Sequence, residues 1–506
     1  MSITALTTAT ILLAATPSIV EDPPPVSITI YSSADPAGFD PQRYVAQQRS
    51  GFDPSAAWQV PGFGVVKQLR TFDLESGRNS VSFTDVAAFL DPTTVGFTDL
   101  TDPETAILEQ SFQFDLVSPS KLLERYLDRK IKVVVPSGEE SRVLTGTLLS
   151  SNQGRLVIRT RSGLEIVDGS SAQISLQELP EGFLTRPTLV WDLLASEAGA
   201  HQIRTTYQTA GLTWRADYNL VLNGDDTSAD LTAWVTLLNL SGISYPDAQL
   251  KLVAGDVQRV QPRLERAAGY GGGRRSVAMD AAKFGGFQEQ PFFEYHLYTL
   301  PRPTTVANNS SQQLALFPTV QGAKVSKELV YEPTRTTRFG SEPYTDRDFA
   351  MYGGDDIGVF VSFKNTEKNS LGMPLPKGRI RAYKQDPKDG TLEFIGEDLI
   401  DHTPRNETVR IKLGDAFDVV GERKIVDFDL DTARRTMSET VEIEVRNQKK
   451  AVADVVVKEH LYRWRNWKIE QRNLPFEKVN ASTVEWKLEI APEKSATIRY
   501  RVDYSW

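Results

Sequence analysis

Few side chains in this 506-residue chain could carry out chemistry, because it has four histidines and no cysteine. The histidines are His201, His296, His402 and His460, and none has a second histidine at metal-site spacing. The absence of cysteine excludes thiol nucleophiles, disulfides, iron–sulfur clusters and cysteine-based zinc sites. We therefore predict neither a bound metal nor a cofactor.

One candidate site is the segment Asp398-Leu399-Ile400-Asp401-His402. Two carboxylates beside an imidazole could bind a cation or transfer a proton. The same residues suit a turn in which Asp401 accepts backbone N–H groups and His402 packs at a strand end. We favour the turn and keep Asp398, Asp401 and His402 as candidate binding residues.

The second candidate is aromatic and consists of Trp464 and Trp467, which stand among arginines in the segment Tyr-Arg-Trp-Arg-Asn-Trp. Exposed tryptophans beside arginine can stack on a sugar or on a partner protein. The alternative is that both rings pack in the core or at the rim of a β-sandwich. We keep Trp464 and Trp467 as candidate binding residues.

Catalytic motifs are absent from the sequence. No Gly-x-Ser-x-Gly occurs, and the glycines at 271–273 do not precede a Lys-Ser/Thr helix start. The acidic residues Glu442, Glu444, Glu485 and Glu489 alternate with apolar residues, which predicts that they face solvent. We therefore predict no catalytic residue.

Two acidic loops, at residues 223–226 and 386–390, place side-chain oxygens close together. Neither has the spacing of an EF-hand calcium loop. An Asp-Gly pair also favours a tight hairpin turn without any ion. Both segments are therefore predicted to be turns.

The elements that would position these residues are strands, because apolar and charged residues alternate with a period of two at 441–446, 484–490 and 498–504. This pattern is typical of antiparallel strands with one buried face. Similar runs recur at residues 27–31, 131–135, 155–159, 203–207, 217–222, 230–238, 357–363 and 378–383. Repeated short strands without long helices predict sandwiches or barrels.

One helix is expected after Ser118, which can cap it, with Pro119 at the first position. Residues 131–176 then read as five short strands whose pattern resembles small SH3- or Sm-like barrels. Residues 265–290 are rich in glycine and alanine and are predicted to be a flexible insertion between strands.

The segment 209–260, which begins TAGLTWRADYNLVLN, resembles a bacterial family of domains of unknown function, family 4139. Further matching pieces are FEYHLYTLPRPTTV, NSLGMPLPKGRIRAY, FIGEDLIDHTPRNE and the closing RYRVDYSW. The family also occurs as the C-terminal part of mucoidy-inhibitor-like proteins, whose N-terminal coiled coil has no counterpart here. The resemblance covers roughly residues 110–506. It implies an exported β-rich protein and supplies no catalytic residues.

The N-terminus and the charge balance bear on the compartment and on partners. Residues 4–20 form a small-residue apolar run that precedes Glu-Asp-Pro-Pro-Pro, a pattern typical of a signal peptide, although no lysine or arginine occurs before Arg43. No other stretch has the length of a membrane span. The net charge of −9 disfavours nucleic-acid binding.

These observations predict a mainly β, multi-module protein. We expect a signal-like or disordered tail at 1–25, a β module at 26–128 that ends in the helix, a small barrel at 129–180, and a β-sandwich region at 181–506. The predicted function is an exported, envelope-associated structural or interaction component without catalytic activity, with another protein or envelope component as its partner. Two alternatives remain. One is a hydrolase with a carboxylate-based site at a sandwich edge or domain junction, and the other is a carbohydrate-binding protein.

Overall fold

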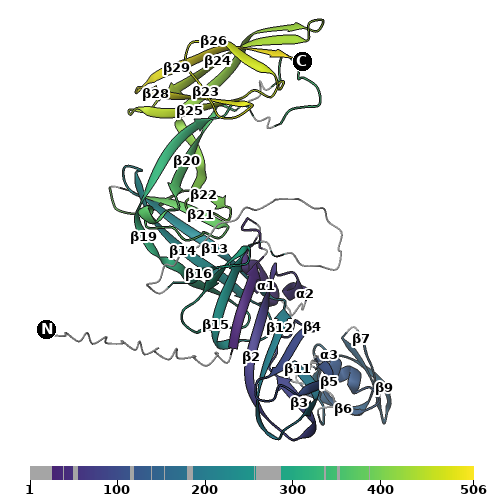
Figure 1. The fold of residues 1–506 in the computed structure, drawn as a ribbon. Coiled ribbons are helices and arrows are strands. Elements are labelled where there is room, and N and C mark those ends of the chain that lie inside the picture. Colours follow the sequence, from purple (N-terminus) through teal and green to yellow (C-terminus); the bar gives the residue numbers. More distant parts are fainter. Residues whose placement is uncertain are drawn as a thin grey trace, which may run out of the picture.

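Alternating apolar and polar residues form strands throughout the molecule, so the predicted mainly β fold is confirmed. A computed structural model describes residues 26–32, 34–37, 39–49, 55–113, 119–137, 140–152, 154–178, 186–255, 257, 286–334, 338–349, 354–386 and 388–506. The molecule is elongated, with a small five-stranded sheet at one end and the C-terminal strands at the other (Figure 1). The tail at 1–25, Ser118 and most of the expected insertion lie outside the described residues.

An eight-stranded sheet joins N-terminal strands to strands much later in the chain. Its strands are β1 (Val26–Ser32), β2 (Gly62–Leu74), β4 (Leu90–Asp99), β12 (Gly199–Thr209), β15 (Tyr245–Ala254), β16 (Gln288–Phe292), β17 (Tyr295–Thr299) and β18 (Thr304–Val306). β1 pairs in parallel with β15 and antiparallel with β2. The sheet therefore crosses the boundaries expected at residues 128 and 180. β16 also shows that the end of the expected insertion is a strand.

A three-stranded sheet packs on one end of this sheet. It consists of β3 (Gly77–Thr84), β11 (Thr188–Ala195) and β5 (Ala106–Gln113). The Trp191 ring of β11 is buried, and its centroid lies 5.3 Å from that of Phe83 on β3 and 5.2 Å from that of Phe97 on β4. These rings hold the two sheets face to face.

A thirteen-stranded sheet runs through the middle and C-terminal parts of the molecule. Its strands are β13 (Leu212–Leu222), β14 (Ser228–Asn239), β19 (Ser310–Tyr331), β20 (Asp356–Lys364), β21 (Gly378–Gln385), β22 (Leu392–Ile400), β23 (Thr408–Asp431), β24 (Thr436–Asn447), β25 (Ala453–His460), β26 (Trp467–Arg472), β27 (Glu477–Lys478), β28 (Thr483–Ile490) and β29 (Lys494–Ser505). The first part of β19 pairs with β14, and its last part pairs with β20 and β25.

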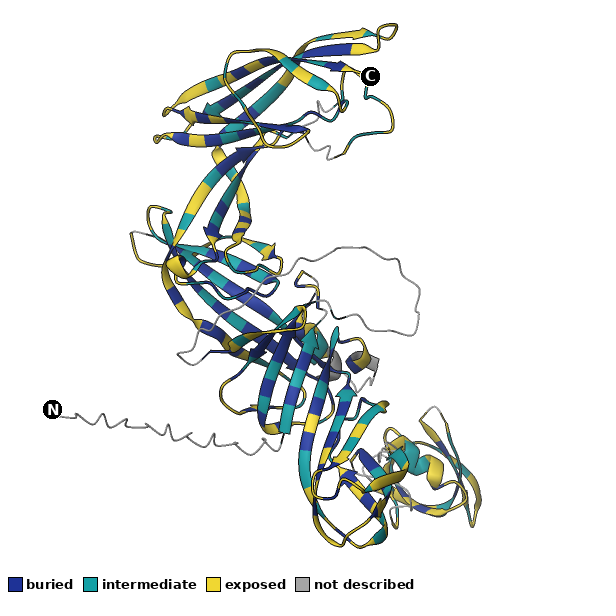
Figure 2. Ribbon diagram, in the orientation of Figure 1, coloured by how far each residue is buried: buried dark blue, intermediate teal, exposed yellow. Residues whose placement is uncertain are grey.

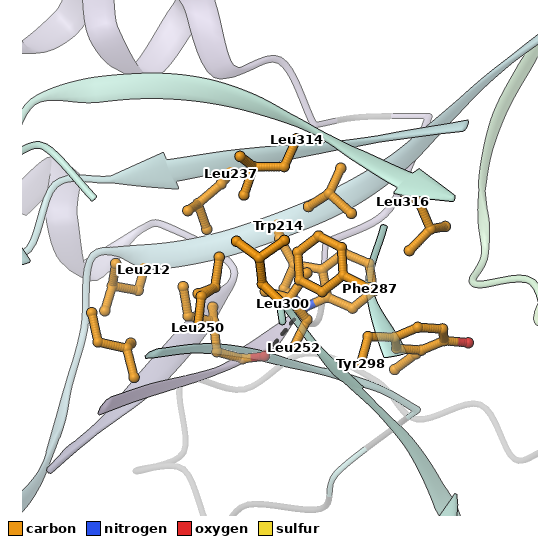
Figure 3. Packing of buried hydrophobic residues seen from close by; sticks show 14 of the residues in the cluster. Leu212, Trp214, Leu237, Leu250, Leu252, Phe287, Tyr298, Leu300, Leu314 and Leu316 are labelled. Carbon is orange, nitrogen blue, oxygen red and sulfur yellow. Dashed lines mark hydrogen bonds between the residues drawn. The ribbon is translucent and has the colours of Figure 1, made fainter. Parts of the chain in front are cut away.

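The middle sandwich has its core between the eight-stranded sheet and strands β13, β14 and β19. Leu250 and Leu252 of β15 lie opposite Trp214, Leu237 and Leu314 in this core (Figure 3). The indole of Trp214 also donates a hydrogen bond of 3.1 Å to the backbone oxygen of Ile30. This bond ties the two layers together.

The C-terminal domain has a core of its own. Val441 and Ile443 of β24, Val457 of β25 and Trp486 of β28 are buried there. Buried residues alternate with half-buried ones along most of β24 (Figure 2). The expected orientation of the apolar residues at 441–446, 484–490 and 498–504 is therefore confirmed.

The five-stranded sheet at the opposite end contains β6 (Lys130–Ser137), β7 (Glu140–Asn152), β8 (Arg155–Thr160), β9 (Gly163–Asp168) and β10 (Gln173–Ser175), in the order β10-β6-β7-β8-β9. The five predicted strands are confirmed, but no closed barrel is formed, because β9 and β10 do not pair. The predicted helix, α3 (Pro119–Arg125), precedes the sheet, and Tyr126 just after it is buried in the core of this sheet.

Two further short helices, α1 (Pro41–Arg49) and α2 (Ser55–Trp58), follow β1, and one 3-10 turn, η1 (Glu367–Asn369), lies between β20 and β21. Phe39 and Val60 beside the two helices pack with Phe89 and Leu238 in a small separate core. In the described part of the chain, no helix has the length and apolar character needed to cross a membrane.

Candidate functional site

A hollow of about 660 Å³ lies on the C-terminal domain and contains Trp467. We call it the Trp467 groove. The strands β23, β24, β26 and β29 supply most of its lining, which consists of Asp429, Thr436, Met437, Ser438, Arg465, Asn466, Trp467, Lys468, Glu470, Lys478, Ala481, Arg501, Asp503, Tyr504 and Ser505. Four of these side chains are basic and three are acidic, so the lining combines two aromatic residues, Trp467 and Tyr504, with charges of both signs.

The Trp467 ring is fixed in a defined position. Trp467 opens β26 and stands opposite Tyr504 of β29 in the antiparallel pairing. Its indole N–H donates a hydrogen bond of 2.8 Å to the backbone oxygen of Ala481, and the Lys478 ammonium lies 4.5 Å from the ring centroid. A half-buried tryptophan held in this way can offer apolar surface to a ligand without first becoming ordered.

Four of the seven charged residues of the groove form two ion pairs at its surface. Lys468 lies 2.7 Å from Glu470, and Arg501 lies 3.2 Å from Asp503. These pairs are well exposed, so each contributes little to stability and can exchange for a ligand. The groove can therefore recognise a polar or mixed-charge partner.

Below the groove, Tyr504 leads to a buried ion pair. Its hydroxyl donates to Glu439 Oε1 at 3.1 Å, and Arg463 Nε donates to Glu439 Oε2 at 2.8 Å. Burial, and then the neighbouring Glu439 carboxylate, raise the pKa of Tyr504 well above its usual value. Arg463 also donates to the backbone oxygens of Tyr344, Asp346 and Arg347. Arg463 thus ties the segment 338–349 to the C-terminal domain.

A second buried pair joins Glu459 of β25 to Arg423 of β23, with distances of 3.0 and 3.2 Å from the guanidinium to the carboxylate. The Tyr500 hydroxyl also donates to Glu459. Burial alone would lower the pKa of Arg423, but the Glu459 carboxylate outweighs this effect and raises it. Both carboxylates are buried, and neither Glu439 nor Glu459 lines the Trp467 groove.

The geometry can be compared with known proteins. A family model described as a domain of unknown function (DUF4139) matches residues 203–506. The chain belongs to the DUF4139 family. The resemblance drawn from the sequence is thereby confirmed, with a match that starts at residue 203 rather than near 110. No curated protein matches the chain.

The DUF4139 region contains both tryptophans predicted as binding residues, but they occupy different places. Both rings pack against the C-terminal core, but Trp467 also lines the groove, whereas Trp464 does not and has the Arg465 guanidinium 5.6 Å from its ring. The two rings therefore do not form one binding surface.

The segment 398–402 of the DUF4139 region lies on and after β22. Asp398 Oδ2 accepts the backbone N–H of Lys412 on β23 at 2.7 Å, which links two strands that have no ladder between them. His402 Nδ1 accepts the backbone N–H of Lys377 at 3.2 Å, and the backbone oxygen of Asp401 accepts the Thr403 hydroxyl. Asp398 and His402 thus hold backbone groups.

The other three histidines each contact a carboxylate. His201 Nδ1 lies 2.6 Å from Asp99 Oδ2 in the interior, His296 lies 2.7 Å from Glu289, and His460 contacts Glu332. These pairs join residues far apart in the sequence or on different strands. Sequence spacing therefore gave no signal for the His201 and His460 pairs.

Asp99 and Asp102 form a second group of buried carboxylates. Asp99 accepts hydrogen bonds from the backbone of Thr101 and Asp102 and from the Thr105 hydroxyl. Asp102 accepts both the backbone N–H and the hydroxyl of Ser196, at 3.0 and 2.8 Å. Apart from His201, every hydrogen-bond donor to these two carboxylates is neutral.

The described residues contain no group of three histidine, aspartate or glutamate side chains that could hold a metal ion. In the turn at 223–226, Asp225 accepts the Thr227 hydroxyl at 2.7 Å, and Asp226 contacts two lysines. Both carboxylates are already occupied by protein donors.

The buried Glu439 and Glu459 were missed in the sequence, yet a signal existed. Glu439 falls in the same phase of β24 as the buried Val441 and Ile443, and Glu459 falls in the same phase of β25 as Val457. A charged residue at an inward position of an otherwise apolar face indicates a buried ion pair.

Proposed function

We propose that this DUF4139 protein is a non-catalytic interaction protein that recognises another protein or an envelope component through the Trp467 groove. The observation that carries the proposal is a held tryptophan beside exposed, exchangeable charge pairs in a hollow of about 660 Å³. Tryptophan and arginine are the residues that contribute most at protein interfaces. The buried glutamates support the same reading, since each is already paired with an arginine.

Site-specific photo-crosslinking in the cells that naturally make the protein tests this proposal. A photoreactive residue replaces Lys468 in the groove, and in a separate control it replaces Lys487, which is comparably exposed on the same domain. A defined adduct is expected from position 468 and not from position 487. Equal adducts at both positions would contradict a specific groove.

A pair of tryptophan variants tests whether the ring itself contributes. Trp467→Ala is expected to remove the adduct at position 468, because it removes the apolar centre of the groove. Trp58→Ala is the matched control, since Trp58 is 61% exposed on α2. An adduct that survives Trp467→Ala and disappears with Trp58→Ala would overturn the assignment.

A carbohydrate ligand is the second candidate, and the polar lining around a single tryptophan favours it. Binding of purified protein to a panel of immobilised glycans tests this alternative. Saturable binding that Trp467→Ala abolishes would support a sugar as the ligand in place of a protein.

We also propose that the protein is exported. The apolar run at 4–20 followed by Glu-Asp-Pro-Pro-Pro supports this proposal. Intact-mass measurement of protein from its native cells is expected to show loss of roughly the first 15–25 residues. Retention of Met1 would contradict cleavage of a signal peptide.

A further inference from the structure

The strand β9 forms one edge of the five-stranded sheet, at the end of the molecule opposite the C-terminal domain (Figure 1). It pairs with β8 and with no other described strand. Its side chains Leu164 and Ile166 are 65% and 69% exposed, although both are large and apolar. An open strand edge of this kind is a template on which a further strand can pair.

Other edge strands of the molecule carry residues that discourage pairing with a second chain. β4 contains Pro92, β16 contains Pro291, β26 contains Lys468 and β3 contains Arg78. Proline, cationic side chains and bulges are the usual means by which proteins block an open edge. β9 contains no proline, lysine or arginine, and its pairing with β8 has no register shift. The β9 edge is therefore unprotected, whereas these four are protected.

The turn before β9 determines which of its backbone groups point outwards. Thr160 pairs with Gly163 across a two-residue turn, and the pair that closes such a turn exchanges hydrogen bonds. The pattern then alternates along the strand, so Glu165 directs its backbone groups to β8. Leu164 and Ile166 direct theirs away from the sheet. The two residues with exposed apolar side chains are thus the ones whose N–H and C=O groups face outwards.

We propose that β9 pairs with β9 of a second copy of this chain, antiparallel about a two-fold axis, to form a dimer. The pairing sets Ile166 opposite the partner's Ile166, and Leu164 opposite the partner's Asp168. Each Ile166 then exchanges both backbone hydrogen bonds with its counterpart. The two leucines and two isoleucines form one apolar cluster across the axis, because diagonal neighbours on paired strands also touch.

Charge complementarity favours a second copy as the partner and selects the register. Arg159 of β8 is exposed, stands beside Leu164, and forms no ion pair in the described structure. The partner's Asp168 lies only two strand spacings of ~4.8 Å from Arg159, within reach of its long side chain. A shift by two residues would instead set Glu165 against the partner's Glu165, which like charges disfavour. The two-fold axis makes the favourable contact twice.

The edge is only six residues long, so the dimer should be weak and reversible. It does not involve the Trp467 groove and is independent of the function proposed for that groove. The dimer carries two Trp467 grooves, which allows a partner with two binding segments to attach at both.

Sedimentation velocity of the full chain over a range of concentrations tests whether the dimer forms. A reversible change from monomer to dimer is expected as the concentration rises. Ile166→Lys should weaken the dimer at least roughly tenfold, because it sets two ammonium groups against each other and removes the central apolar contact. Monomer at every concentration, assemblies larger than a dimer, or undiminished association of Ile166→Lys would each overturn the proposal.

Two matched variants accompany this measurement. Leu392→Lys makes the same change of charge at a leucine that is 56% exposed on the edge strand β22, and should leave the dimer unchanged. Trp467→Ala should also leave it unchanged, because the groove and the β9 edge are separate. A loss of association with Leu392→Lys equal to that with Ile166→Lys would show that β9 is not the contact.

Single cysteines test the register, since the chain has none of its own. Ile166→Cys should form a disulfide between copies on mild oxidation, because hydrogen-bonded antiparallel pairs place their Cα atoms about 5.5 Å apart, within disulfide range. Leu164→Cys is the control on the same face of β9. Its counterpart lies four residues further along the partner strand, more than roughly 13 Å away, and should not crosslink.

Both cysteine positions are exposed, so neither variant removes a core side chain. Absence of a disulfide through position 166 at concentrations where the dimer forms would overturn the pairing. A disulfide through position 164 as efficient as that through 166 would overturn it as well.

Discussion

The N-terminal and C-terminal parts of the molecule bury carboxylates in two different ways. Asp99 and Asp102 are held by backbone N–H groups and hydroxyls of their own turn and of Ser196, and Asp99 also contacts His201 of β12. Glu439 and Glu459 are held by arginines and tyrosines from other strands of the C-terminal domain. The first arrangement satisfies a charge with neutral dipoles, and the second pairs it with an opposite charge.

This difference determines what happens when a carboxylate is removed. Loss of Asp99 or Asp102 leaves backbone N–H groups and hydroxyls, and for Asp99 also His201; the backbone and hydroxyl donors lose hydrogen bonds but carry no charge. Loss of Glu439 or Glu459 leaves a guanidinium inside the protein without its counter-charge, a much costlier result. The comparison therefore predicts a ranking of effects that can be measured.

The largest effect is expected for Glu459→Gln, which should lower the free energy of unfolding of the C-terminal domain by about 3–5 kcal/mol. The reason is that Arg423 would remain buried with a neutral partner, and its Nη1 already has no hydrogen-bond partner in the described structure. Urea unfolding followed by tryptophan fluorescence measures the loss.

Two controls accompany Glu459→Gln. Glu477→Gln breaks an exposed pair and should change stability by no more than about 0.5 kcal/mol. The double variant Arg423→Met/Glu459→Met should be more stable than Glu459→Gln, because it removes both charges together. If Glu459→Gln is as stable as Glu477→Gln, the comparison between the two regions fails.

A smaller effect is expected for Asp99→Asn in the N-terminal region. The amide cannot accept from all the donors that surround Asp99, and its own NH₂ group would face two of them, so a loss of about 1–3 kcal/mol is expected. Hydrogen exchange of the β4 and β12 amides reports this loss locally. A loss as large as that of Glu459→Gln would contradict the distinction between dipoles and charges.

The smallest effect concerns pH and Asp102. Hydrogen bonds, first that from the Ser196 hydroxyl, lower the pKa of Asp102 to about 2 from an ordinary value near 3.8. Because the folded pKa lies below the unfolded one, the contribution of Asp102 to stability is complete above about pH 4 and is lost as the pH falls towards 2.

Thermal unfolding at pH 5, 4 and 3 tests this dependence. The difference in melting temperature between the parent protein and Asp102→Asn should narrow from pH 5 to pH 3, because the unfolded chain binds a proton at Asp102 before the folded protein does. A difference that stays constant from pH 5 to pH 3 would show that Asp102 is not the group that titrates.

Local patterns in the sequence were sufficient to predict the strands. Val441 and Ile443 alternate with glutamates and are buried as expected, and Pro119 opens the expected helix. The partners of the strands were not predictable in the same way. β1 pairs with β15, more than two hundred residues later, and no local pattern records that choice.

The candidate site was predictable in part. Tryptophan beside arginine pointed to Trp464 and Trp467 together, and nothing in the spacing showed that only Trp467 would line the groove. The cluster of Asp226, Lys327 and Lys384 was not predictable, because these residues are brought together only by the pairing of distant strands. Sites of this kind depend on topology, which a single sequence does not display.

The long strands β19 and β23 each belong to both the middle sandwich and the C-terminal domain. β19 pairs with β14 and then with β20 and β25, and β23 pairs with β20 and then with β24. A force applied along the molecule would therefore act on these strands in shear, parallel to the strands and across many interstrand hydrogen bonds at once. The two parts should therefore move together as one rigid unit, so the Trp467 groove keeps a fixed orientation relative to the middle sandwich.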